Sequence, residues 1–523
     1  MLSSTYDNLY HVNINEPKVH PLVRKSFAFV PSAGMRLAPE ILILEFFREV
    51  FFDTHYGATG GKDLDPDELA EDRIHLFKIE ERALLHALRG RRRKSRNAKS
   101  KSFFAPSYPS LAEKGWLGKN RERVIVNFLL GGPIAQHLWG GGETENKKRE
   151  QKRLVDTLIQ ALVGHNSFSD DDPHEKEILS VALRHTSFEI NKEVARDNIF
   201  SKTRSDAVMK IPCDELAKCI FNDLLALCEL EKRVPRMQWL QVFMTFLRFS
   251  MPMWLLAQMR ITSLLHDCLL AVIDQGEQID SINIKRKISS RNRGLLHPSL
   301  TPTREIFEKT EQYMKKRVEL NILLYLLESV RAEKITNKRL EIKGAGSEVL
   351  TVEQLLQIAR EAIGDMKSSK WFRELAGEGK FQDFLIRMAE KHAAWRDPLK
   401  KGQGKNIDEF FRVLYRDNLG DEVGGYLLLP EGRGCTRGFR VIPGQLLLKT
   451  IAFLAAHDRK TNNNTQGGGK LVLEDVEIHF KKYGIDFSYA ADARPLLMRE
   501  LKAMGLLSGS PDAGISVAVE CPY

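Results

Sequence analysis

One apolar stretch, Val234–Ile273, constrains the fold of this chain more than any other segment, because it is rich in Leu, Met, Phe and Trp. Three arginines, Arg236, Arg248 and Arg260, interrupt it at intervals of twelve residues, and Pro252 lies within it. No run therefore reaches the roughly 18 to 20 uncharged residues that a membrane span requires. Because proline breaks helices, we expect two core helices here, nearly surrounded by protein, at the hydrophobic centre of a middle domain.

The length and composition indicate a folded protein of several domains. The chain has 523 residues, enough for two to four domains of about 150 residues each. Apolar side chains make up 43% of the residues and charged ones 28%, which excludes the disordered, collagenous and disulfide-stapled classes. Helical periodicity dominates the chain up to its last hundred or so residues. We therefore expect a mainly α fold, a multi-domain helical body followed by an α+β module.

The strongest helical patterns and the breaks between them predict the domain organisation. Helices are expected at residues 40–52, 63–90, 145–164, 212–232, 303–334, 350–366, 381–394 and 407–416. The breaks divide the chain into an N-terminal helical domain (1–166), a central apolar helical domain (173–300), a helical connector (301–420) and a C-terminal domain (421–523).

A basic run at residues 89–101 holds most of the excess positive charge. It contains eight Lys and Arg residues and no acidic residue, namely Arg89, Arg91, Arg92, Arg93, Lys94, Arg96, Lys99 and Lys101. Subtracting these eight from the 79 basic residues leaves 71 against 69 acidic residues, so the rest of the chain is nearly neutral. Such a run can contact several phosphates. We expect it to associate with DNA, with a solvated loop or a contact to an acidic partner protein as the alternatives.

A second, smaller basic cluster lies at Lys285, Arg286 and Lys287. If it shares a face with the basic run, the two would form one track for a nucleic acid backbone. The sequence does not fix that arrangement.

The last part of the chain changes character. Short apolar segments at 426–430 and 438–442 flank a turn-forming sequence, which predicts a hairpin. Helical patterns follow at 443–458, 473–484 and 490–505, and the chain ends in a strand, a Gly/Pro turn and a second strand. This order over Val441–Tyr523 resembles a winged-helix domain.

The resemblance implies a role for the third of these helices, because in winged-helix domains that helix commonly enters the major groove. Here it would present Arg494, Arg499 and Lys502 to DNA. The hairpin tip departs from the pattern of DNA-binding wings, since it carries Asp512 and no cation. Winged-helix domains also dock onto proteins, and both roles stay open.

The six cysteines include no Cys-x-x-Cys pair. Four of them lie in apolar helical patterns, so we expect buried, reduced thiols in a cytoplasmic protein, without a metal or another cofactor. They are Cys213, Cys219, Cys228 and Cys268.

Enzyme motifs are incomplete. The Gly467–Lys470 loop lacks the spacing of a nucleotide-binding P-loop. The pair His266–Asp267 has no defined histidine partner upstream, and Glu341 and Lys343 have the spacing of nuclease residues but lack an upstream aspartate. A divergent metal-dependent nuclease or phosphohydrolase is therefore the alternative rather than the main hypothesis.

The main hypothesis is a non-catalytic adaptor or scaffold subunit that associates with DNA and with other protein subunits, and not with a membrane. Taken whole, the chain loosely resembles the large helical accessory proteins of bacterial anti-phage and DNA-restriction systems, such as methylation-associated defence. That resemblance implies a role in antiviral defence. A purely protein-binding scaffold is the further alternative.

Overall fold

A computed structural model describes about half of the chain. The described residues are 43, 46, 47, 49–51, 129–139, 143–164, 191–203, 214–275, 294–336, 383, 407, 410–416, 424–432, 437–462, 471–508 and 517–523. Helix makes up 72% of the described residues, which confirms the predicted mainly α fold. The basic run 89–101 and Lys285–Lys287 lie outside the described residues.

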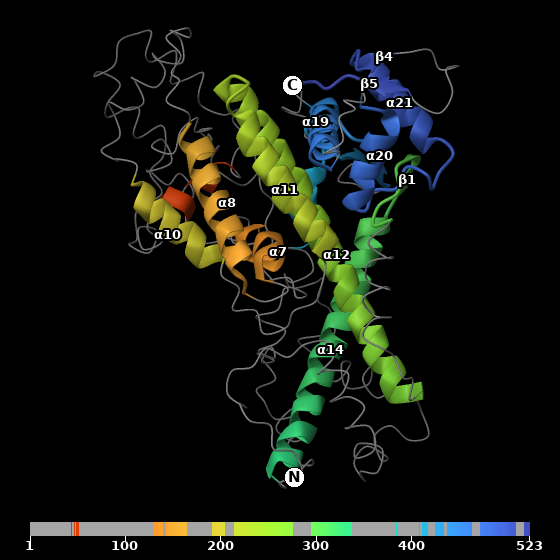
Figure 1. Cartoon of the computed structure of the whole chain (residues 1–523). Helices are drawn as coiled ribbons and strands as arrows, with labels where there is room; N and C mark the ends of the chain where they lie inside the picture. The colour runs from red at the N-terminus through yellow and green to blue at the C-terminus, as the bar shows by residue number, and fades with distance from the viewer. Residues whose placement is uncertain are drawn as a thin grey trace, which may run out of the picture.

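The helices surround one long central helix, α12 (Figure 1). The N-terminal helices are η4 (Leu130–Ile134), α7 (Ala135–Trp139), α8 (Glu145–Val163) and α10 (Lys192–Thr203). The central ones are α11 (Asp214–Leu230), α12 (Arg236–Gln275) and α14 (Glu305–Thr336), followed by the short η5 (Arg412–Leu414). Three more helices, α19 (Gln445–Asn462), α20 (Leu473–Lys482) and α21 (Ala493–Ala503), lie near the C-terminus. α11 contacts α8 on one side and α19 and α20 on another, and α12 packs along α14.

Helix α12 is continuous, so the prediction of two helices broken at Pro252 was wrong. An internal proline costs a helix about 3 kcal/mol. The neighbouring side chains of Met251, Met253 and Trp254 are at most 1% exposed, and each such burial contributes roughly 1.5 to 3 kcal/mol. Packing on both sides of the proline therefore outweighs the local defect.

The same helix is long and apolar enough to cross a membrane, and among the described helices it alone meets that test. However, 78% of its most apolar window is buried inside the protein. Burial of this extent is what the sequence pattern predicts for a core helix.

The three arginines of α12 point in different directions. A spacing of twelve residues turns the helix by about 120° and advances it by about 18 Å. At the first position, Arg236 is 6% exposed and donates hydrogen bonds of 2.6 Å to the carbonyls of Ala161 and Leu162. These carbonyls lie in the last turn of α8, where no helical N–H is available to them.

The other two arginines also bind main-chain carbonyls. Arg248, which is buried, donates to the carbonyls of Val413 and Tyr415 at the end of η5. Arg260 donates to the carbonyl of Gly294 over 3.1 Å. Each arginine thus joins α12 to a different segment of the chain.

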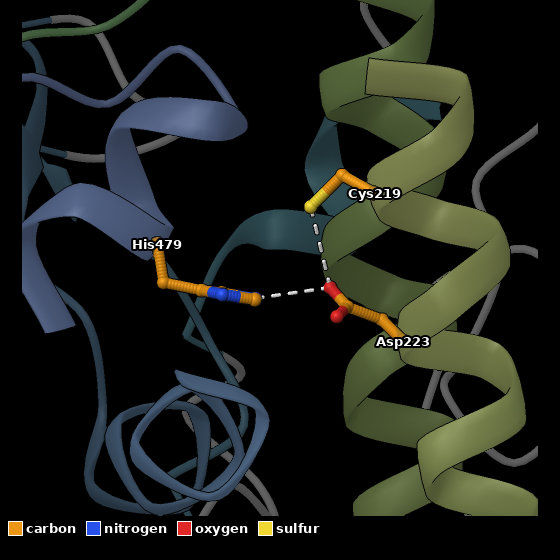
Figure 2. Close-up of side chains that lie close together, drawn as sticks. All are labelled: Cys219, Asp223 and His479. Carbon is orange, nitrogen blue, oxygen red and sulfur yellow. Dashed lines mark hydrogen bonds and ion pairs between the residues drawn. The ribbon is translucent and has the colours of Figure 1, made fainter. Parts of the chain in front are cut away.

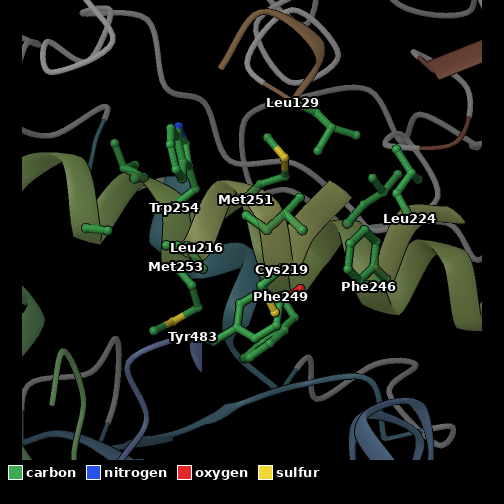
Figure 3. Packing of buried hydrophobic residues seen from close by; sticks show 14 of the residues in the cluster. Leu129, Leu216, Cys219, Leu224, Phe246, Phe249, Met251, Met253, Trp254 and Tyr483 are labelled. Atoms are coloured by element: carbon green, nitrogen blue, oxygen red, sulfur yellow. The ribbon is translucent and has the colours of Figure 1, made fainter. Parts of the chain in front are cut away.

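Buried apolar residues form one cluster from Ile43 to Val519. Figure 3 shows its centre, where Met251 of α12 points toward Leu129, while Phe249 and Met253 lie on the side of α12 that faces Tyr483, just beyond α20. Residues far apart in sequence therefore share one core.

A three-stranded antiparallel sheet has the order β1-β3-β2. Strands β2 (Leu428–Glu431) and β3 (Gly438–Val441) form the predicted hairpin. Strand β1 (Ser299–Thr303), which was not predicted, pairs with β3. Gly438 has a φ of 93°, and an added Cβ would lie 2.2 Å from the carbonyl oxygen of Thr303, so only glycine fits there. Strand β1 lies across the proposed domain boundary at residue 300, and it pairs with β3 of the proposed C-terminal domain. The proposed domain divisions stay predictions.

Residues 445–523, here called the C-terminal module, contain three helices followed by a hairpin. Strand β4 (Leu507–Ser508) pairs with β5 (Ala518–Val519), and Val472, just before α20, forms an antiparallel bridge with Ala518. The predicted order of elements is therefore present.

Replacing Arg248 with methionine tests the role of the arginines. The substitution keeps an apolar stem but leaves two main-chain carbonyls without this donor, so we expect the free energy of unfolding to fall by about 2 to 4 kcal/mol. The matched control, Arg499→Met on the exposed face of α21, should change it by no more than about 0.5 kcal/mol. Chemical denaturation followed by circular dichroism measures both. Equal effects would contradict the assigned role.

Candidate functional site

Four buried side chains meet between α11 and α20, and we call them the junction cluster: Cys219, Asp223, His479 and Tyr483. Figure 2 shows the first three of them. The Oδ2 atom of Asp223 lies 3.0 Å from Nε2 of His479 and 3.6 Å from Sγ of Cys219. The hydroxyl of Tyr483 donates a hydrogen bond of 2.6 Å to the same oxygen. Three polar groups thus converge on one carboxylate oxygen.

Helical spacing places these side chains. Cys219 and Asp223 are four residues apart on α11, and side chains at this spacing lie on the same helix face. His479 and Tyr483 have the same spacing at the end of α20. Asp223 is 4% exposed and His479 is 2% exposed, so the cluster is enclosed by protein.

Burial dominates the electrostatics of the junction cluster. It raises the pKa of the Cys219 thiol well above its ordinary value, and the charge of Asp223 raises it further. Burial, and then the charge of Asp223, likewise raise the pKa of Tyr483 well above its ordinary value. Both groups are therefore protonated at neutral pH.

The cluster could act in two ways. It could be a hydrogen-bonded connection between two helices, or it could hold a metal ion, because the ligand atoms of Cys219, Asp223 and His479 all lie within 4.8 Å of one another. Among the described residues, this is the one group of three His, Cys, Asp or Glu side chains that could hold a metal.

The junction cluster was not predicted from the sequence, although α11 carries a signal for it. Asp223 is a carboxylate within the apolar sequence IFNDLLALC, and a charged side chain on the buried face of a helix needs a partner. That partner, His479, is 256 residues away, and neither segment alone identifies the other.

A second polar group, the α12–α14 clasp, is defined by His266, Asp267, Lys316 and Glu319. The ring of His266 is 1% exposed, with Nδ1 3.2 Å from Asp267 and Nε2 2.7 Å from Glu319. Lys316 Nζ donates to both oxygens of Asp267 over 2.7 Å. His266 and Asp267, the residues of the alternative nuclease hypothesis, thus connect α12 to α14. Both ring nitrogens of His266 face carboxylates.

The pKa of His266 reflects opposing causes. Burial disfavours its charged form, but the hydrogen bonds and charges of Asp267 and Glu319 outweigh burial and raise the pKa above its ordinary 6.5. The pKa of Asp267 is lowered, because His266 and Lys316 outweigh the opposite effect of its burial.

The predicted nucleic-acid residues of α21 are exposed and lie on the outer side of the helix. Nε of Arg494 is 3.1 Å from Glu477, and Arg499 is 2.9 Å from Glu500. Intramolecular carboxylates therefore partly neutralise this face.

The other predicted nucleic-acid residues lie outside the described part of the chain. They are Arg89, Arg91, Arg92, Arg93, Lys94, Arg96, Lys99, Lys101, Lys285, Arg286 and Lys287.

The charge of the C-terminal module is balanced. Residues 445–523 contain nine Lys and Arg residues and nine Asp and Glu residues. Lys481 and Lys482 of α20 pair with Asp486 and Asp458. The charges of this module therefore sum to zero, unlike those of the basic run.

Comparisons with protein-family models, with curated proteins and with solved structures found no match for this chain. The resemblance to winged-helix domains, which rests on the order of the elements, therefore stays a prediction. Any function must be inferred from the geometry and the charges of the chain itself.

The α12–α14 clasp predicts a pH-dependent stability. Because the folded pKa of His266 lies above its ordinary 6.5, its contribution is complete below that pH and is lost as the pH rises through the folded value. We expect Glu319→Gln to lower the free energy of unfolding by about 1 to 3 kcal/mol near pH 5.5, and by less near pH 9.

Glu311→Gln is the matched control, because Glu311 pairs with Lys315 on the surface of the same helix. Its effect should stay below about 0.5 kcal/mol at both values of pH. Thermal unfolding at the two values measures both variants. A loss in Glu319→Gln that does not depend on pH would contradict the protonated state of His266.

Proposed function

We propose that this protein is a non-catalytic adaptor in a larger assembly, which holds DNA through the basic run and docks onto other proteins through the C-terminal module. The observation that carries the proposal is the separation of charge along the chain. Eight cations without an acid lie at residues 89–101, whereas the C-terminal module contains nine charges of each sign.

Binding to DNA depends on such concentrated charge. Each phosphate neutralised by Lys or Arg releases counterions, which makes the affinity fall steeply as salt rises. The basic run can supply several such contacts within thirteen residues, and these contacts are independent of the DNA sequence. The proposal is therefore association with DNA rather than reading of a sequence.

The surface of the C-terminal module supports a docking role. Its exposed residues include two large apolar side chains, Ile478 at 48% and Tyr489 at 73% exposure. Leu300, in the neighbouring strand β1, is 41% exposed, and its main-chain N–H donates to Asp492. Aromatic and apolar side chains without net charge are typical of protein interfaces.

The fold proposed for this module is winged-helix-like. Three helices and a hairpin support it, as does the bridge from Val472 to Ala518, which adds a short third strand to the hairpin. An adaptor of this kind fits the helical accessory proteins of bacterial anti-phage systems that the sequence loosely resembles.

Substitution of four residues in the basic run tests the proposal. Replacing Arg91, Arg92, Arg93 and Lys94 with alanine should weaken binding to duplex DNA and lower the slope of log affinity against log salt by about four, or about one per phosphate contact. The folded core should keep its stability, which circular dichroism measures. Fluorescence anisotropy at several salt concentrations gives the slopes.

A triple variant of the C-terminal module is the second arm of this experiment. Arg494→Ala, Arg499→Ala and Lys502→Ala together should change the salt slope by less than about one. A large change in this variant, with none in the basic-run variant, would assign DNA binding to the module instead. No binding to DNA by the unmodified protein at low salt would leave a purely protein-binding scaffold.

A further inference from the structure

The junction cluster has the ligands of a zinc site. Zinc is bound in proteins by thiolate sulfur, imidazole nitrogen and carboxylate oxygen, usually with four donor atoms. Cys219, Asp223 and His479 each offer one such donor atom, these atoms all lie within 4.8 Å of one another, and all three side chains are buried. We propose that these three residues hold a zinc ion that joins the C-terminal module to the helical body.

The distances between the donor atoms fit this ion. Tetrahedral zinc with bonds of about 2.0 to 2.3 Å separates its ligand atoms by about 3.3 to 3.8 Å. In the cluster, Asp223 Oδ2 is 3.0 Å from His479 Nε2 and 3.6 Å from Cys219 Sγ. The atoms therefore need only small rearrangements around an ion.

Charge balance also favours a divalent cation. A thiolate, a carboxylate and a neutral imidazole carry two negative charges, which zinc neutralises. The Phe249 ring lies 4.8 Å from that of Tyr483. In such an apolar setting a buried carboxylate requires a compensating partner, and a zinc site leaves no net charge.

A second observation concerns the ring of His479. Its Nδ1 atom is buried and has no hydrogen-bond partner in the described part of the chain. The ring is thus oriented only through Nε2, which faces Asp223. Nε2 is therefore the ring atom that would bind zinc, and the Tyr483 hydroxyl would orient the ligating carboxylate.

Binding requires the loss of a proton. A cysteine binds zinc as a thiolate, so the neutral thiol of Cys219 must give up its proton. Zinc then displaces this proton, which leaves to solvent as the S–H bond is replaced by a Zn–S bond. No oxidation or reduction occurs, and zinc affinity should fall in acid.

The consequence is structural. Cys219 and Asp223 belong to α11 in the helical body, and His479 belongs to α20 in the C-terminal module. The ion would fix the position of the module, and this inference does not depend on whether the protein binds DNA.

Metal analysis of the full-length protein tests the proposal. The chain is dialysed against a chelator and then titrated with Zn²⁺, and separately with Co²⁺, whose thiolate complexes absorb in the near ultraviolet. We expect about one zinc ion per chain and a thiolate-to-cobalt band in the unmodified protein. Zinc should also raise the temperature of unfolding.

Two variants locate the ion. Cys219→Ser should abolish the cobalt band and weaken zinc binding by more than about 100-fold. Cys228→Ser is the matched control, because Cys228 is a buried cysteine on the same helix outside the cluster, and it should keep both the band and the affinity. Circular dichroism checks that each variant is folded.

Two results would overturn the proposal. A folded, metal-free protein that neither binds zinc stoichiometrically nor develops the cobalt band would make the cluster a hydrogen-bonded connection only. A band that survives in Cys219→Ser would place the metal elsewhere. If Cys219→Ser fails to fold, His479→Gln replaces it, and retention of tight zinc binding in that variant would equally contradict the proposal.

Discussion

Hydrogen bonds from the arginines of α12 to main-chain carbonyls organise this structure. Burial of a guanidinium is unfavourable unless its donors are satisfied, and Arg236 and Arg248 are both buried against the ends of other elements. Their spacing directs them to different sides of one apolar helix. The same principle governs the junction cluster and the α12–α14 clasp, where buried polar groups occur at contacts between helices.

The sequence predicted local structure well and long-range contacts poorly. Periodicity located α8, α11 and α14, and turn residues located the hairpin of β2 and β3. The predicted helix break at Pro252 was wrong, because tertiary packing determines whether a helix tolerates proline. Strand β1 was missed, since the sequence SLTPT shows no alternation and pairs with residues about 140 positions away. The junction cluster was missed for the same reason, as Asp223 and His479 belong to distant segments.

The functional proposal and the metal proposal describe different parts of the molecule. The concentrated charge at residues 89–101 supplies attraction to a polyanion. The C-terminal module, whose charges sum to zero, supplies an exposed surface. Among its described large apolar residues, Tyr489 is the most exposed. Zinc at the junction cluster would determine how firmly this surface is held against the helical body. An adaptor needs such a fixed geometry between the parts that bind its partners.

The central claim is that buried polar contacts between helices, made by α12 and by the junction cluster, join the described elements into one cooperative unit. Native-state hydrogen exchange, followed by mass spectrometry at increasing denaturant, tests this claim most directly. The amides of α12, α11 and α19 should exchange with the same free energy, equal to that of global unfolding. Exchange of α19 to α21 at a clearly lower free energy than α12 would show that the C-terminal module opens separately, and would contradict the account.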